Sequence, residues 1–224
     1  MREVSEVILG RDSTSKLDNK IYAAYKNAMD SKLPPEEMEK SELRLVELLD
    51  ELRRLLSSRQ ADVKAKWNRG LPFADYIVDR WQRAKDLGFG AGTSIYDSAL
   101  VLGSITVGEN TFIGPSTVLD GTGNLKIGSN CSISAGVQIY SHDSVMWAVS
   151  GGIEKLEYKA TTIGSNCYLG PCVVVAKGVV IGDGCIIGAH SLVLEDIPAG
   201  SKAFGTPCKV VGKAPSLPLL DKAS

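Results

Sequence analysis

A six-residue period in the second half of the chain constrains its fold more than any other feature. Aliphatic residues recur at every sixth position in three runs: Val101, Val107, Ile113 and Leu119, then Ile127, Ile133 and Ile139, and then Ile163, Leu169, Val175, Ile181, Ile187 and Val193. A two-residue slip through the segment DGTGNLK separates the first two runs. This period matches neither an α-helix nor the two-residue alternation of a hairpin sheet. It fits short strands joined by tight bends, three to a coil of about 18 residues.

The residues next to these aliphatic positions suit a triangular prism. Glycine often follows directly, at Gly108, Gly114, Gly128, Gly164, Gly170, Gly182 and Gly188. Compact residues stand four positions after the aliphatic ones, at Thr111, Thr117, Cys131, Val137, Cys167, Val173, Val179, Cys185 and Ser191. We therefore predict a mainly β fold, a parallel β-helix of about four to five coils over residues 93–202. Its inner corners should bury Cys131, Cys167 and Cys185 as small apolar fillers, with Cys172 and Cys208 more exposed.

The first part of the chain follows a different pattern. Residues 1–16 are expected to be a flexible N-terminus and residues 17–92 a helical region that covers one end of the prism. A helix start is indicated by two prolines followed by two acids, Pro34, Pro35, Glu36 and Glu37. An apolar stripe of helical spacing is formed by Leu45, Leu49, Leu52 and Leu56. A further helix is expected from Pro72 to Leu87.

Composition excludes several classes of function. The 224 residues carry a formal net charge of −1 without a long basic block, so a nucleic-acid partner is not expected. No stretch approaches the roughly 20 apolar residues of a membrane span, and a cytoplasmic protein is the expectation. The five cysteines form no CxxC pair, which argues against a disulfide framework or a zinc ribbon.

The repeat is interrupted after Ile139 by the segment YSHDSVMWAVSGG. The sixth-place positions that follow hold Val145, Gly151 and Glu157 instead of a run of aliphatic residues. Residues 140–162 are therefore expected to leave the coil as an excursion loop. Long loops on a rigid scaffold commonly carry function, so we interpret this one as a functional arm.

The repeat over about residues 95–200 resembles the hexapeptide-repeat acyltransferases, which have a left-handed β-helix. The segment AFGTPCKVVGK, which opens the C-terminal segment and tail at 203–224, is similar to the closing segment of their acetyl-CoA-dependent members. The chain is most similar to the branch of galactoside, maltose and serine acetyltransferases. LPFADYIVDRW and VQIYSHDSVMWAVSGG also resemble sugar O-acetyltransferases of surface-polysaccharide biosynthesis. The resemblance implies a homotrimer, active sites between neighbouring prisms, acetyl-CoA as acyl donor and no metal.

The resemblance also implies that His142, at the mouth of the arm, is the catalytic general base. Histidine suits this role because its side chain titrates near neutral pH and can take the proton of an attacking hydroxyl. Asp143 follows directly, but adjacent side chains of an extended segment point to opposite sides. The sequence therefore leaves open which group orients the His142 ring.

Coenzyme A is implied to contact five positions, which are Pro171, Ala189, Gly205, Pro207 and Lys209. The first two would meet the pantetheine arm, and Lys209 would meet a nucleotide phosphate as a point charge. Lys177 could assist Lys209 in this contact, but a solvated lysine in a turn is the favoured interpretation.

Three aromatic residues are candidates for acceptor binding: Tyr140, Trp147 and Tyr168. An aromatic face can stack on the apolar side of a sugar ring, although simple packing of the loop is an equal alternative. The asparagine with which galactoside-type enzymes hold their acceptor is replaced here by Gly114, so a lactose-like acceptor held in the same way is not expected.

The sequence offers four candidate functions. The first is O-acetylation of a saccharide or glycan precursor, and the second is N-acetylation of a nucleotide amino sugar on the same fold. The N-terminal region lacks the strand-helix alternation and Gly-rich turn of a nucleotide-binding unit, which disfavours the second. A prism-type carbonic anhydrase would need three zinc-bound imidazoles, and the chain has two histidines. A non-enzymatic assembly protein would leave the arm and the closing segment unexplained.

Overall fold

The computed structural model describes residues 40–215 of the chain. Three parts of the chain lie outside the described residues: the expected flexible segment 1–16, the beginning of the expected helical region with its start at Pro34 and Pro35, and the tail beyond residue 215. The chain divides into two compact units, Met1–Leu71 and Pro72–Ser224. Each unit is described by itself.

The described part of the first unit is one long helix, α3 (Lys40–Trp67). The leucine stripe runs along it: Leu45, Leu49 and Leu56 are partly buried, and Leu52 is exposed. Lysines in its last turn complement the negative end of the helix dipole.

The second unit begins with two short helices, α4 (Phe73–Ile77) and α5 (Arg80–Asp86). The prediction of one helix from Pro72 to Leu87 was wrong, because the chain is extended at Val78 and Asp79. The Asp79 carboxylate accepts hydrogen bonds from the N–H groups of Trp81 and Gln82, so it caps a new helix. A capping aspartate inside an apolar helical pattern was the overlooked signal.

Helix α5 packs against the first strand of the prism, β1 (Ser94–Ile95). Ala84 is buried, and the Arg83 guanidinium donates hydrogen bonds to the carbonyl oxygens of Tyr96 and, at 2.9 Å, Ala99. These contacts satisfy carbonyl groups at the start of the β-helix, where no earlier coil is stacked.

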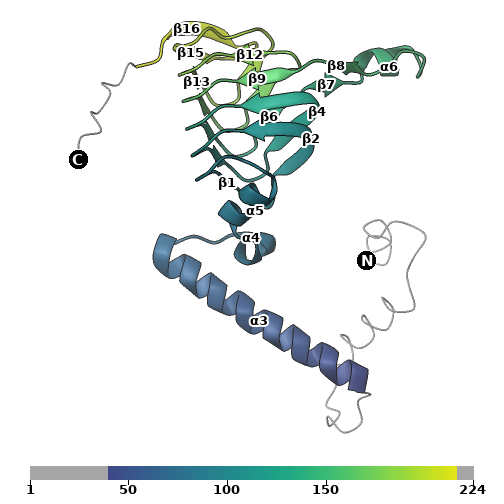
Figure 1. Ribbon diagram of the computed structural model, residues 1–224, viewed down its shortest axis with the longest axis vertical. Coiled ribbons are helices and arrows are strands. Elements are labelled where there is room, and N and C mark those ends of the chain that lie inside the picture. Colours follow the sequence, from purple (N-terminus) through teal and green to yellow (C-terminus); the bar gives the residue numbers. More distant parts are fainter. Residues whose placement is uncertain (1–39, 216–224) are drawn as a thin grey trace. The chain divides into compact units, whose positions relative to one another are not determined.

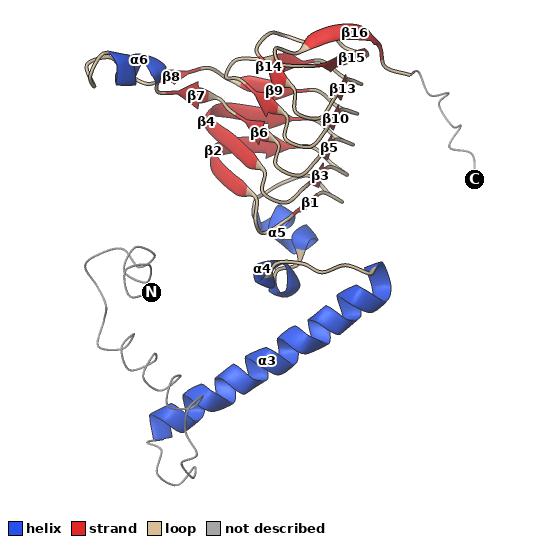
Figure 2. Ribbon diagram, turned by 180° about the vertical axis from the view of Figure 1, so that it is seen from behind, coloured by secondary structure: helices blue, strands red, loops and turns tan. Residues whose placement is uncertain are grey.

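The rest of the second unit is a parallel β-helix with three faces (Figures 1 and 2). One face stacks β1, β3 (Phe112–Ile113), β5 (Ser132–Ile133), β10 (Tyr168–Leu169), β13 (Ile186–Ile187) and β15 (Ser201–Phe204), and β16 (Lys209–Lys213) pairs antiparallel at its end. The second face stacks β2 (Leu100–Val107), β4 (Val118–Ile127), β6 (Gln138–Ile139), β11 (Val174–Val175) and β14 (Leu192–Val193). The third is formed by the later parts of β2 and β4 with β9 (Thr161–Ile163) and β12 (Val180–Ile181).

The prism has more coils than predicted, since six parallel strands stack on its first face. Ile95, which begins the six-residue count, and Ala203, which ends it, are both fully buried. The prediction of four to five coils missed the last coil, because an alanine replaces the expected large aliphatic residue and the spacing shortens before β15, and it left out Ile95, which lies six positions before Val101.

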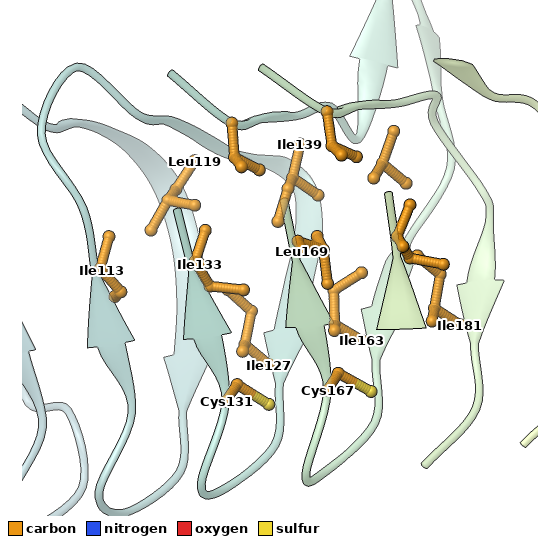
Figure 3. Packing of buried hydrophobic residues seen from close by; sticks show 14 of the residues in the cluster. Ile113, Leu119, Ile127, Cys131, Ile133, Ile139, Ile163, Cys167, Leu169 and Ile181 are labelled. Carbon is orange, nitrogen blue, oxygen red and sulfur yellow. The ribbon is translucent and has the colours of Figure 1, made fainter. Parts of the chain in front are cut away.

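The predicted inward positions form the hydrophobic core. Figure 3 shows aliphatic side chains from successive coils stacked inside the prism, with Cys131 and Cys167 on neighbouring bends. All the predicted corner residues are buried, from Thr111 to Ser191. The expected exposure of Cys208 was wrong, because the turn after β15 folds it back onto Leu192, whose carbonyl accepts its N–H. Cys172 is exposed as expected, and all five cysteines are free.

The core allows a stability prediction. Ile133 is fully buried on β5 between β3 and β10. Ile133→Ala should lower the free energy of unfolding by about 2–5 kcal/mol, because the stacked coils cannot collapse around the lost volume. Urea unfolding followed by circular dichroism measures this, with Ile133→Val expected to cost only about 0.5–1.5 kcal/mol. Equal losses in the two variants would contradict a tightly packed prism.

Candidate active site

Both irregularities of the repeat lie at one corner of the prism, between the second and third faces. The slip DGTGNLK is part of β4, which runs through this corner, and the arm leaves the same corner on the next coil. The coils approach closely here: a Cβ on Gly121 would overlap the carbonyl oxygen of Ser104, and one on Gly123 would overlap that of Ser141. Glycine permits this contact. The slip and the arm therefore build one local structure.

Asp120 is the buried polar centre of this corner, with none of its surface exposed. Its Oδ1 accepts hydrogen bonds from the N–H and hydroxyl of Thr122, and its Oδ2 accepts from the N–H groups of Ser141 at 2.8 Å and His142 at 3.1 Å. Burial raises the pKa of the Asp120 carboxyl, but these hydrogen bonds, led by the Thr122 side chain, lower it more. The net pKa lies well below the usual range, so Asp120 is an ionised carboxylate.

His142 is oriented by this carboxylate. Its Nδ1 lies 2.6 Å from Asp120 Oδ2, and 30% of its side chain is exposed. An ionised carboxylate can only accept hydrogen bonds, so Nδ1 carries the proton and donates it. In the neutral ring Nε2 then has a free lone pair. This is the arrangement of a histidine general base with a carboxylate orienter.

The arm is an antiparallel pair, β7 (His142–Asp143) and β8 (Glu157–Tyr158), with the short helix α6 (Val145–Val149) beyond it. Figures 1 and 2 show it projecting away from the prism. The Tyr158 ring stacks on the His142 ring, with centroids 5.9 Å apart and planes inclined by 21°. Trp147, on α6, is half exposed. Imidazole, phenol and indole rings therefore line the root and tip of the arm.

The positions expected to contact coenzyme A lie on another corner, between the first and second faces. The N–H of His190 donates to the Pro171 carbonyl at 2.9 Å, and the Thr206 hydroxyl donates to the His190 carbonyl at 3.0 Å. Pro171, Ala189, Gly205 and Pro207 are thus brought together on successive coils. Lys209 stands on β16, where its Nζ lies 3.2 Å from Glu195 Oε2.

The structure does not bring His142 close to these positions within one chain. The two corners flank the second face, so its strands separate His142 from Pro171 and Ala189. Tyr168 is half exposed on the first face, also away from His142. Tyr140 is nearer, but its hydroxyl donates to Gln138 Oε1 at 2.7 Å.

Two residues of the site were missed from the sequence, Asp120 and Tyr158. The signal for Asp120 was its place directly after the inward Leu119, at the start of the slip segment. Tyr158 had no signal, because its position depends on the pairing within the arm. Within residues 40–215, no cluster of three or more His, Cys, Asp or Glu side chains is arranged to hold a metal, and no helix has the length and apolarity to cross a membrane.

Comparisons with known proteins agree with this architecture. The family model "Bacterial transferase hexapeptide (six repeats)" matches residues 160–195, and "Hexapeptide repeat of succinyl-transferase" matches residues 104–141. Galactoside O-acetyltransferase of Escherichia coli (strain K12) is 32% identical over 126 residues, which are 47% of this chain and 62% of that protein. The chain thus spans less than two thirds of that relative.

Solved structures share the fold. The N-acyltransferase AntD from Bacillus cereus, in complex with dTDP and 3-hydroxybutyryl-CoA, superposes with a TM-score of 0.52 at 20% identity, covering 57% of this chain and 72% of that one. Its S84A mutant, in complex with dTDP-4-amino-4,6-dideoxyglucose and coenzyme A, gives a TM-score of 0.51 at 17% identity, covering 60% and 89% of the two chains. At these identities the likeness shows the β-helix fold.

Proposed function

We propose that this hexapeptide-repeat protein is an acetyl-CoA-dependent O-acetyltransferase that acetylates a hydroxyl of a saccharide or glycan precursor. The observation that carries the proposal is the buried, ionised Asp120 carboxylate that holds Nδ1 of His142 at the root of the arm. The 32% identity with a galactoside O-acetyltransferase supports the reaction type.

In this proposal His142 moves the proton. Acetyl-CoA, when bound, supplies an activated thioester, so no charged nucleophile is needed from the protein. His142 Nε2 accepts the acceptor's hydroxyl proton as that oxygen attacks the acetyl carbonyl, and Asp120 stabilises the resulting imidazolium. The carbon–oxygen bond forms, the carbon–sulfur bond breaks, and His142 returns the proton to the departing thiolate.

The corner formed by Pro171, Ala189 and Gly205 fits an extended pantetheine arm. These residues are at least partly exposed and stacked on successive coils, which gives a straight edge beside backbone groups. Lys209 and Glu195 are both largely exposed, with 61% and 74% of their side chains accessible. Such a surface ion pair is weak, so Lys209 can exchange its carboxylate for a phosphate.

The active site is proposed to form between copies of this chain. An acyl donor on the Pro171 corner of one protomer cannot meet His142 of the same prism, since a whole face lies between them. A homotrimer would bring the Pro171 corner of one protomer to the His142 corner of the next. The apolar side chains of the arm, with Val149 74% and Ile153 84% exposed, provide contact surface for a neighbour. A cytoplasmic location, where acetyl-CoA is available, is part of the proposal.

The acceptor is proposed to bind beside the His142–Tyr158 pair. Tyr158 and Trp147 are each about half exposed, so their ring faces are available to the apolar side of a sugar. Tyr140 lies at the root of the arm and could contribute its ring. Tyr168 could take part only through a neighbouring protomer.

Thiol release from acetyl-CoA, measured against a panel of saccharides, nucleotide sugars and amino sugars, tests the proposal. We expect turnover with hydroxyl acceptors. Turnover only with amino acceptors would replace it with N-acetylation. Absence of coenzyme A binding in calorimetry would remove the acetyltransferase assignment altogether.

Lys209→Ala should weaken coenzyme A binding about 3–10-fold, because one exposed cation on a phosphate contributes about 1 kcal/mol. Calorimetry with coenzyme A and with dephospho-coenzyme A measures the effect, which should vanish for the ligand without the 3′-phosphate if Lys209 meets that group. Lys126→Ala, which removes an equal charge from the exposed surface of β4, serves as the control. Equal weakening by both substitutions would show a general charge effect and would contradict the assigned contact.

A further inference from the structure

The root of the arm has two chemically different sides. In the antiparallel register His142 pairs with Tyr158, and Asp143 pairs with Glu157. Side chains alternate along a strand, so the two rings lie on one side and the two carboxylates on the other. Carboxylates directly opposite each other on neighbouring strands repel and destabilise the pair. The register that stacks Tyr158 on His142 therefore also creates a like-charge pair.

Lys177, from the next coil, neutralises that pair. Its Nζ contacts the Asp143 carboxylate and lies 2.6 Å from Glu157 Oε2. Hydrogen bonding to Asp143 and then to Glu157 raises the pKa of Lys177, and the same contact lowers the pKa of Asp143. Although 35% and 51% of the two acidic side chains are exposed, only 20% of the lysine is. The lysine side chain is thus less exposed than either acid, and its charge is directed at the arm.

The bend that carries Lys177 is itself tied to the returning end of the arm. The N–H of Gly178 lies 2.9 Å from the Thr161 hydroxyl and 3.2 Å from the Lys159 carbonyl. Gly178 has a φ of +78°, and a Cβ there would overlap the aliphatic chain of Lys159. The Lys177 ammonium is therefore presented from a bend whose backbone is already attached to the arm.

We propose that Lys177 is a positioning residue: it clamps Asp143 and Glu157 from the next coil and thereby holds the opposite side of the hairpin, where His142 stacks on Tyr158. The effect on catalysis rests on the proposed function, but the effect on His142 geometry does not. Lys177 stands at the His142 corner, across the second face from Pro171 and Ala189, so a role in binding coenzyme A on its own prism is not supported. Its sequence interpretation as a solvated turn lysine is replaced by this clamp.

Three full-length variants test the clamp: Lys177→Met, Lys177→Arg, and Lys177→Met combined with Asp143→Asn and Glu157→Gln. The last variant removes the repelling charges together with the lysine. One readout is the His142 imidazole signal in NMR, assigned with a His190→Gln variant because the chain has two histidines. A second is the rate at which trypsin cuts after Lys155, an exposed residue in the arm, measured by mass spectrometry. The third is steady-state kinetics of acetyl transfer, which gives kcat and KM separately.

We expect Lys177→Met to shift or broaden the His142 signal, to speed cleavage after Lys155 about fivefold, and to lower kcat about tenfold. Lys177→Arg should keep all three near the wild-type values, and the triple variant should recover most of the loss. An unchanged His142 signal and cleavage rate in Lys177→Met would overturn the proposal. A triple variant as impaired as Lys177→Met would overturn it too, because Lys177 would then act on something other than the two acids. If the wild-type chain transfers no acetyl group, the proposed function fails, while the NMR and proteolysis readouts still decide the clamp.

Discussion

His142→Ala should lower kcat by about 10²–10⁴-fold, the usual contribution of a positioned general base. The ring is the group in this corner whose Nε2 can take a hydroxyl proton, because Asp120 holds Nδ1 in its protonated form. Binding of coenzyme A should be unchanged, since the corner that carries Pro171 and Ala189 lies across a prism face. Steady-state thiol release and calorimetry on the same preparation measure the two effects separately.

The control for this variant is Glu154→Gln, an exposed position in the arm beyond its paired root. It should keep the wild-type kcat and the wild-type unfolding midpoint, whereas His142→Ala, which takes a hydrogen bond from the buried Asp120 carboxylate, should have a lower midpoint but remain folded under assay conditions. Full activity in a folded His142→Ala protein would make the Asp120–His142 pair a structural contact, and the assignment of a base to this corner would have to be withdrawn.

The prism could be predicted from the sequence because every coil needs the same types of residue at the same positions. An inward aliphatic residue at every sixth position and a compact residue at each corner identify buried sites such as Ile133 and Cys131 without knowledge of the coil above or below. The last coil of the prism was missed, because Ala203 lacks the large side chain that marks a coil. The break between α4 and α5 depended on one capping residue, Asp79, which a count of apolar positions overlooks.

The site could be predicted only where it breaks the repeat. His142 was found because the six-residue count stops beside it, but its partner Asp120 is 22 positions earlier in the sequence. They meet because β4 and β6 pair Leu119 with Ile139, which puts Asp120 on the coil neighbouring the root of the arm. Which side chains meet between neighbouring coils depends on insertions such as the slip, which change how the strands of those coils are paired. Such contacts therefore follow from the strand register and not from the six-residue pattern. Tyr158 and Lys177 depend in addition on the pairing inside the arm.

Asp120→Asn should lower kcat by about 10²–10⁴-fold, although it removes no atom that touches substrate. The amide must place either its oxygen or its NH₂ group beside Nδ1 of His142. With the NH₂ group there, Nδ1 becomes an acceptor and the ring proton moves to Nε2, which can no longer act as a base. With the oxygen there, the tautomer survives, but the negative charge that stabilises the imidazolium is lost and the NH₂ group faces the N–H of Thr122.

Either arrangement also leaves a buried donor without an acceptor, so the variant should lose about 1–3 kcal/mol of unfolding free energy. A double variant separates this cost from the effect on catalysis. If Asp120 acts on the reaction only through His142, then Asp120→Asn combined with His142→Ala should have the kcat of His142→Ala alone, because residues that act as a unit are not additive. A double variant slower than the wild type by the product of the two single effects, at equal folded fraction, would show that Asp120 contributes independently of the imidazole and would contradict its assignment as the orienter of His142.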